Sequence, residues 1–234
     1  MKKLCYLFFI AFLACKNNPI PDGFVSLEES VPSLLIELRY STTDNFVGEI
    51  IDGYRNPKIV LTLETVNALN KVQNELNKQD LGLKIFDGYR PQKAVNHFIR
   101  WAKKLNDTVK KKKYYPMVKK NKLFEEGYVA ERSGHSRGST VDVTLIKIDS
   151  LNYGQELDMG SEWDYFGVKS WINYDSISYL QKENRKLLQN VMIKYGFKPY
   201  SKEWWHFTLE NEPYPETYFD FQKPPALMRV FEYY

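Results

Sequence analysis

Residues 133–148 carry the sequence SGHSRGSTVDVTLIKI, in which a glycine-rich turn leads into a strand. From Val141 to Ile148, apolar side chains alternate with Asp142 and Thr144, and a period of two is typical of a β-strand. A turn at this place would leave His135 near the start of the strand, while Asp142 points from one face of the strand. These two side chains could bind the same metal ion.

A second polar cluster, EWWH at residues 203–206, places the carboxylate of Glu203 three residues before His206. A catalytic zinc ion commonly takes three protein ligands from histidine nitrogens and carboxylate oxygens, and a fourth position stays open for water. His135, Asp142 and His206 supply such a set. Glu203 is then available as the general base for the water and afterwards as the acid for the leaving amine.

Amide hydrolysis passes through an oxyanion, which a fixed cation stabilises. Arg90, in the sequence DGYRP at residues 87–91, is the candidate for this role. Each of these residues also has an ordinary structural explanation, such as a satisfied core histidine, a buried ion pair or a surface charge. The third histidine, His97, lacks a carboxylate or glycine context, so we interpret it as structural.

Helix and strand patterns alternate irregularly along the chain, which favours the α+β class. We expect helices over residues 63–76, after Pro91, and over 176–195, and strands over 34–40, 83–86 and 204–207. The apolar stripe of the helix over 176–195 is predicted to comprise Leu180, Leu187, Leu188, Val191, Met192 and Tyr195.

The chain has 234 residues, of which 43% are apolar and 26% charged, and this composition is typical of one folded domain. Much of the net charge of +4 comes from lysines within residues 103–122. A solvated surface loop is the ordinary interpretation of such a run, and attraction to an anionic wall or membrane surface is the alternative. No recognised nucleic-acid motif accompanies the lysines, so we expect no nucleic-acid partner.

The N-terminus resembles an export signal of the bacterial lipoprotein type. Two lysines precede an apolar run over residues 4–13, which is too short to span a bilayer, and Ala14 precedes Cys15. We therefore expect residues 1–15 to be a signal peptide with lipidation at Cys15, residues 16–22 to be a tether, and residues 23–234 to be the folded domain. The protein would be a membrane-anchored lipoprotein facing the periplasm, or cytoplasmic if this interpretation of the N-terminus is wrong.

The pattern Ser-x-His-x-x-Gly, with Asp seven residues after the His and Glu-x-x-His far downstream, resembles the D-alanyl-D-alanine dipeptidase family of zinc metallopeptidases. The resemblance extends from about Gly23 to Phe221. Further segments that look like family segments are Tyr40, Asp44-Asn45-Phe46 with Gly48, Asp52-Gly53-Tyr54, DGYRP at 87–91, Tyr114-Tyr115-Pro116, GYVA at 127–130, Met159-Gly160, EWWH at 203–206 and EPYP at 212–215.

This resemblance implies the zinc peptidase fold of D-Ala-D-Ala carboxypeptidases and the Hedgehog signalling domain, with a central antiparallel sheet flanked by helices. It places one zinc ion on His135, Asp142 and His206. Glu203 falls on the catalytic base and Arg90 on the transition-state stabiliser.

The resemblance also implies a pocket for a small dipeptide. Asp164 falls on the carboxylate that meets the free ammonium of the substrate, and Ser133, Tyr40 and Tyr54 fall on positions that line the pocket. A blocked or extended substrate would leave Asp164 unpaired in a small cavity, so dipeptides should be preferred over longer peptidoglycan stems.

Three alternatives remain at this point. The chain could be a D,D- or L,D-carboxypeptidase that trims muropeptides, a cell-wall binding module with a relic zinc site, or a surface-anchored structural protein that uses its lysine-rich segment as a contact. An intact Glu203 and Arg90 argue against simple binding, which needs neither. Because an exported enzyme cannot drain a cytoplasmic dipeptide pool, salvage of wall-derived dipeptide is favoured over antibiotic resistance.

Overall fold

The computed structural model describes residues 20–56 and 58–222. A five-stranded sheet has the order β2-β4-β5-β7-β6, and its strands are β2 (Leu35–Ile36), β4 (Leu81–Asp87), β5 (Thr140–Lys147), β7 (Glu203–Leu209) and β6 (Phe197–Tyr200). Neighbouring strands are antiparallel except β2, which runs parallel to β4. The expected antiparallel sheet is therefore mixed at one edge. A separate antiparallel pair is formed by β1 (Phe24–Ser26) and β3 (Val60–Thr62).

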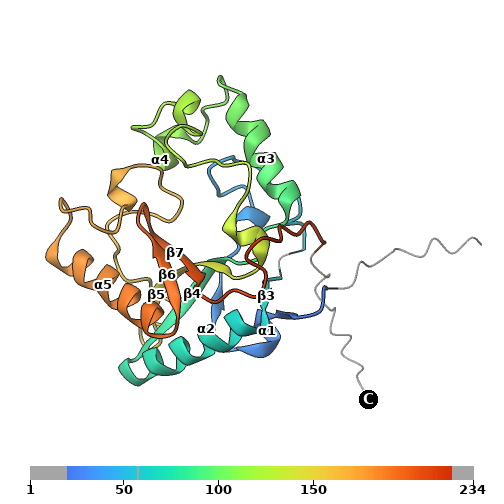
Figure 1. The fold of residues 1–234 in the computed structure, drawn as a ribbon. Coiled ribbons are helices and arrows are strands. Elements are labelled where there is room, and N and C mark those ends of the chain that lie inside the picture. Colours follow the sequence, from blue (N-terminus) through green and yellow to red (C-terminus); the bar gives the residue numbers. More distant parts are fainter. Residues whose placement is uncertain (1–19, 57, 223–234) are drawn as a thin grey trace, which may run out of the picture.

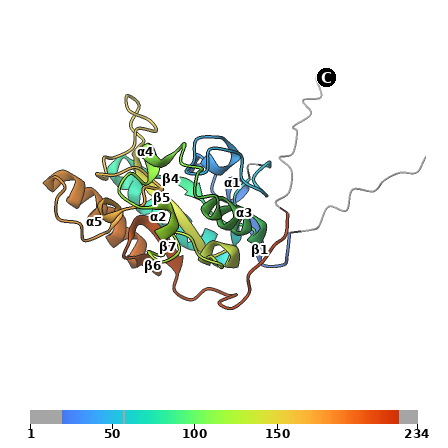
Figure 2. The same ribbon diagram turned by 90° about the horizontal axis from the view of Figure 1, so that it is seen from above.

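Helices lie on both sides of the five-stranded sheet, so the architecture belongs to the expected α+β class (Figures 1 and 2). Figure 1 shows α2 (Leu63–Leu76) below the sheet and α5 (Tyr179–Lys194) to its lower left, with α3 (Gln92–Lys103) and α4 (Lys111–Tyr114) above it. The short α1 (Leu27–Ser30) follows β1. Apolar side chains at helical spacing bury one face of α2, among them Val66, Leu69, Val72 and Leu76.

The helix predicted over 176–195 begins three residues later than expected. Ser178 caps it, because its Oγ accepts a hydrogen bond from the backbone N of Gln181 at 3.2 Å while the Gln181 side chain accepts from the backbone N of Ser178 at 2.8 Å. Leu180 lies in the first turn and is 65% exposed, so its place in the apolar stripe was predicted wrongly. Leu188, Val191 and Met192 are buried as expected.

The other strand boundaries differ where the elements are short. The strand expected over 34–40 is reduced to Leu35–Ile36, and a 3-10 turn begins at Arg39. Strands β1, β3 and β6 were not predicted from the sequence. The last of these contains Pro199 and lies at the sheet edge, which is where a residue without a backbone N–H is tolerated.

The lysine-rich segment is more ordered than a solvated loop. Tyr114, Tyr115 and Leu123 are fully buried. Lys120 is only 6% exposed, and its Nζ lies 4.0 Å from the centre of the Trp101 ring. The prediction of a solvated run is therefore wrong for Lys120, although Lys103, Lys104, Lys112 and Lys119 do face water.

The segment that follows β7, residues 210–222, crosses back over the molecule and holds the turn that contains His135. The backbone N of Phe219 donates to the carbonyl of Ser136 at 2.9 Å. Arg137 pairs with Glu212 at 2.7 Å, and the ring of Phe221 stacks on Tyr89 with 4.0 Å between centroids. These contacts fix the turn against the sheet.

The expected signal peptide over 1–15, including Cys15, lies outside the described residues. Within residues 20–222, apart from position 57, the structure contains no helix long and apolar enough to cross a bilayer.

Truncation of one core leucine tests the packing of α2. Leu69→Ala removes a fully buried side chain, and we expect a loss of about 2–5 kcal/mol in the free energy of unfolding, because a cavity remains. The matched control Leu180→Ala, at the exposed site on α5, should change it by less than about 0.5 kcal/mol. Urea denaturation followed by circular dichroism measures both, and equal losses in the two variants would contradict this packing.

Candidate active site

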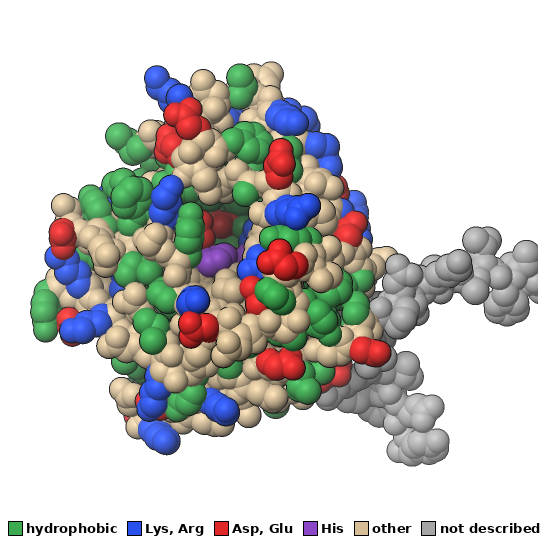
Figure 3. All heavy atoms as spheres, viewed as in Figure 1, with side chains coloured by type: hydrophobic (Ala, Val, Ile, Leu, Met, Phe, Trp, Pro, Cys, Tyr) green, Lys and Arg blue, Asp and Glu red, His purple; other side chains and the backbone are tan. Residues whose placement is uncertain are grey.

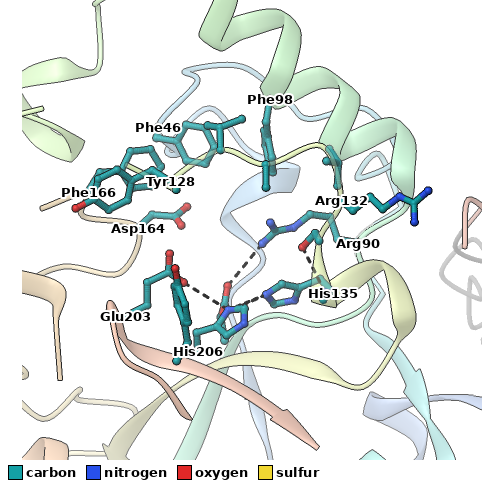
Figure 4. A pocket seen from close by; sticks show the side chains of 18 of the residues that line it. Phe46, Arg90, Phe98, Tyr128, Arg132, His135, Asp164, Phe166, Glu203 and His206 are labelled. Carbon is teal, nitrogen blue, oxygen red and sulfur yellow. Dashed lines mark hydrogen bonds and ion pairs between the residues drawn. The ribbon is translucent and has the colours of Figure 1, made fainter. Parts of the chain in front are cut away.

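The structure brings His135, Asp142 and His206 together, and one ligand atom from each lies within 4.8 Å of the others (Figure 4). Asp142 on β5 is the direct cross-strand partner of His206 on β7, so their side chains share one face of the sheet. The Asp142 Oδ1 lies 3.1 Å from His206 Nδ1 and 3.2 Å from His135 Nε2. His135 comes from a 3-10 turn, Gly134–Arg137, whose preceding Ser133 accepts a hydrogen bond from the His135 backbone N through its Oγ.

The chemistry of this donor set fits zinc. Two imidazole nitrogens and a carboxylate oxygen are donors that zinc prefers, and three protein ligands are usual for a catalytic ion. The Nδ1 of His135 lies 2.9 Å from the Gly88 carbonyl, an interaction that orients the ring and leaves Nε2 for the metal. Burial alone would raise the pKa of Asp142, but the two neighbouring histidines hold this pKa well below its usual range.

Glu203 stands beside this cluster at the start of β7. Its Oε2 lies 3.4 Å from the Nδ1 of His206, and its side chain lines the same cavity. Burial raises the pKa of Glu203, while His206 acts in the opposite direction. A carboxylate with a raised pKa next to a metal site has the position and the proton affinity of a general base.

Arg90 reaches the cavity from the segment between β4 and α3. Its Nε and Nη2 both lie 2.9 Å from Oδ2 of Asp87, and Nη2 is 3.7 Å from Oδ2 of Asp142. The guanidinium also lies over the rings of Tyr40 and Phe98, at 5.2 and 5.3 Å. Carboxylates and aromatic faces therefore fix this cation where negative charge can be stabilised.

Tyr54 was predicted to line the pocket, and the structure places it behind the wall instead. It is fully buried, and its Oη donates to Oδ1 of Asp87 at 2.7 Å. Because Asp87 holds Arg90, Tyr54 supports this cation from behind the wall. Asp87, within DGYRP, had no predicted role, although a carboxylate three residues before the candidate arginine was a usable signal.

Asp164 faces the metal ligands from another wall of the cavity (Figure 4). It is 6% exposed, and it accepts a hydrogen bond of 2.7 Å from Oη of Tyr40. Burial raises the pKa of Asp164 well above its usual value, and the negative charge of Asp142 adds to the effect. A cation bound beside Asp164 would reverse this shift, so the position suits an ammonium group.

The predicted metal ligands share one cavity of about 320 Å³ with Glu203, Arg90 and Asp164. Ser133 and Tyr40 also line this cavity, as predicted. Figure 3 shows the hollow, with histidine and acidic side chains at its floor. Aromatic side chains that the sequence analysis gave no role form the wall opposite the metal ligands, namely Phe46, Phe98, Tyr128 and Phe166. His97 lies outside the cavity, where its Nδ1 accepts a hydrogen bond from the backbone N of Asp52 at 3.2 Å, which agrees with a structural role.

Comparison with known proteins gives the family. A family model described as D-ala-D-ala dipeptidase matches residues 21–224. A D-alanyl-D-alanine dipeptidase of Enterococcus faecium is 41% identical over 199 residues, covering 85% of this chain and 97% of that protein. One from Streptomyces coelicolor is 40% identical and covers 85% of this chain and 96% of that protein. Among solved structures, a mutant of the vancomycin resistance D,D-pentapeptidase VanY in complex with Zn(II) has 16% identity and a TM-score of 0.40, covering 65% of this chain and 74% of that one.

Replacement of one ligand tests the metal site. We expect His206→Ala to bind zinc more than about 100-fold more weakly, because loss of an outer-shell partner alone typically costs about 10- to 100-fold. His97→Ala, at the histidine outside the cavity, is the matched control and should keep full affinity. Zinc content after dialysis and competition with a chromophoric chelator measure both, and a zinc-replete His206→Ala protein would refute the assignment.

Proposed function

This chain belongs to the D-ala-D-ala dipeptidase family, and we propose that it is a zinc-dependent enzyme that hydrolyses D-alanyl-D-alanine to two molecules of D-alanine. The observation that carries the proposal is the presence of a metal-ligand cluster, a carboxylate base and a buried second carboxylate in a single small cavity. The first two suit amide hydrolysis, and the third suits a substrate with a free amino group.

His135, Asp142 and His206 would hold one zinc ion, and the donor set of the site supports this assignment. When bound, zinc polarises a carbonyl and makes water a better nucleophile near neutral pH. Glu203 takes the proton from the attacking water and later transfers it to the amine that leaves. Its raised pKa supports this role, because a base with greater proton affinity removes a proton from water more readily.

Arg90 stabilises the negative charge that develops on the carbonyl oxygen of the scissile amide. Its guanidinium already sits 3.7 Å from the Asp142 carboxylate and is held by two contacts to Asp87. A cation fixed before the reaction needs little reorganisation as the oxyanion forms. Asp87 and Tyr54 therefore support the chemistry by keeping Arg90 in place.

Asp164 binds the ammonium group of the dipeptide, and the hydroxyl of Tyr40 orients the carboxylate. An N-acylated substrate brings no cation to this side chain, so Asp164 must then stay protonated or remain an unpaired buried charge. The aromatic side chains of Phe46, Phe98, Tyr128 and Phe166 bound one side of a cavity of about 320 Å³, a size that suits a small ligand. Both features favour a free dipeptide over a peptidoglycan stem.

A single assay tests this function. The full-length protein with zinc should release D-alanine from D-alanyl-D-alanine and much less from the N-acetylated dipeptide. Glu203→Gln should keep its zinc but lose about 100- to 10,000-fold in rate, the usual contribution of a general base. Released D-alanine is measured with a coupled D-amino acid oxidase assay.

Preference for the N-acetylated substrate would instead support a carboxypeptidase. A Glu203→Gln enzyme with full activity would remove Glu203 as the base. No hydrolysis of either substrate by zinc-loaded protein would favour a binding module.

We further propose that the protein is exported, anchored to the periplasmic side of a membrane through a lipid on Cys15, and used for salvage of wall-derived dipeptide. The apolar run before Ala14-Cys15 supports this location. A lipid anchor with more than one acyl chain gives stable membrane binding, whereas a single chain gives only marginal binding.

Cys15→Ser should move the protein out of the lipid-labelled membrane fraction, because the acceptor thiol is missing. Cys5→Ser, within the expected signal peptide, is the matched control and should leave the mature protein lipidated and in the membrane. Fractionation of cells grown with a labelled fatty acid measures both. A labelled, membrane-bound Cys15→Ser protein would rule out this anchor.

A further inference from the structure

One buried arginine on α5 joins the two ends of the segment that carries Asp164. We call residues 159–171 the Asp164 loop. Arg185 is only 3% exposed, and its Nε donates to the carbonyl of Met159 at 2.6 Å. Its Nη1 donates to the carbonyl of Trp171 at 2.8 Å and its Nη2 to that of Lys169 at 2.7 Å. A single guanidinium therefore binds the start and the end of this loop.

Arg185 forms no ion pair with any residue that the structure describes. Burial lowers the pKa of Arg185 to about 10, although Asp158 acts in the opposite direction, so the group is still charged near neutral pH. Burying a charged group is costly unless its hydrogen bonds are made. All three of its contacts are to backbone carbonyls of the Asp164 loop, so fixing this backbone is what the side chain does here.

The Asp164 loop contributes two side chains to the cavity and a third that contacts a predicted metal ligand. The Nε1 of Trp163 donates to Oδ2 of the predicted metal ligand Asp142 at 3.3 Å. Asp164 faces the cavity, and Phe166 is part of its aromatic wall. Asp164 has φ of +60°, a left-handed conformation that is unfavourable for a residue with a Cβ and persists only where the surroundings impose it.

We propose that Arg185 is a positioning residue for recognition of the substrate ammonium group: it holds the Asp164 loop so that the carboxylate of Asp164 stays in the cavity. This inference rests on the proposed dipeptidase function. The contact between Asp164 and an ammonium group exists in the bound substrate as well as in the transition state. Its loss therefore raises KM more than it lowers kcat.

The test compares four variants of the full-length protein. Arg185→Met keeps most of the side-chain volume and removes all donors, and Arg185→Lys keeps a charge but not the planar fork. Gln73→Leu is the matched control, because Gln73 is a buried side chain on α2 that accepts from the backbone N of Leu83 at 2.8 Å and does not contact the Asp164 loop. Asp164→Asn provides the reference for complete loss of ammonium recognition.

We expect Arg185→Met to raise KM for D-alanyl-D-alanine about 10-fold or more, as for other residues that orient a site from behind. Its kcat should fall less than its KM rises, and its zinc affinity should fall far less than in His206→Ala, since the metal ligands themselves lie on other elements and the loop reaches them through the hydrogen bond from Trp163 to Asp142. The KM of Arg185→Lys should lie between those of the wild type and Arg185→Met. Asp164→Asn should raise KM at least as much as Arg185→Met. An unchanged KM in Arg185→Met, or an equal rise in Gln73→Leu, would overturn the proposal.

Hydrogen exchange separates this inference from the proposed function, because it needs no substrate. In Arg185→Met, the amides of residues 160–171 should exchange faster while those of α2 keep their protection. If the wild-type protein does not hydrolyse the dipeptide, the proposed function fails, and the exchange result alone decides whether Arg185 holds the Asp164 loop. Unchanged exchange in the loop would overturn that role.

Discussion

The pairing of β5 with β7 is the constraint on which the site depends. In this register Asp142 lies opposite His206, and the next pair along the strands is Val141 with Phe207. Val141 and Phe207 are both fully buried on the core face. Because side chains alternate along a strand, a slip by one residue would move His206 into the core and Phe207 into the cavity. Burial of this apolar pair therefore fixes the separation of two predicted metal ligands.

The electrostatics of the cavity follow from its unequal charges. The carboxyl groups of Asp87, Asp142, Asp164 and Glu203 lie in or directly behind its wall, whereas Arg90 is the buried cation among them. Burial raises the pKa values of Asp164 and Glu203, and the positive charge of Arg90 only partly opposes this effect. A metal cation beside Asp142 and an ammonium group beside Asp164 would both restore the balance. Such a cavity is better suited to a cationic amino terminus than to a neutral acyl group.

The sequence predicted best those features that depend on local periodicity. Leu69 and Val72 recur at helical spacing, and α2 has the predicted bounds; the alternation around Asp142 and Thr144 likewise identified β5. The error at Leu180 arose because an apolar residue that continues a helical pattern can lie beyond the edge of the core. Strands as short as β1 and β3 contain too few residues to show a period, and their pairing is settled by distant contacts.

The site residues divide in a similar way. The grouping of His135, Asp142 and His206 followed from residue types and spacing. The place of Asp164 in the pocket came only through family resemblance, because nothing in the local sequence around it indicates a cavity. Tyr54 shows the limit of that resemblance: a residue can belong to a family segment and still act from behind the wall through Asp87. Contacts between segments far apart in the chain, such as Arg185 with residues 159–171, have no signature in a single sequence.

The structure thus places the groups that we propose for chemistry and those that we propose for recognition on different elements. The predicted ligands and base lie on β5, β7 and a turn that residues 210–222 hold through Phe219 and Arg137, so they depend on the sheet and its cover. Asp164, whose backbone has a left-handed conformation, instead lies on a loop. Arg185 of α5 holds this loop through hydrogen bonds from outside the sheet. On the proposed roles, changes in that loop or in its anchor would act first on recognition of the amino terminus, and they would reach the predicted ligands through the hydrogen bond from Trp163 to Asp142. In this fold, substrate choice is therefore the property more easily changed, and hydrolysis is the one that the sheet keeps fixed.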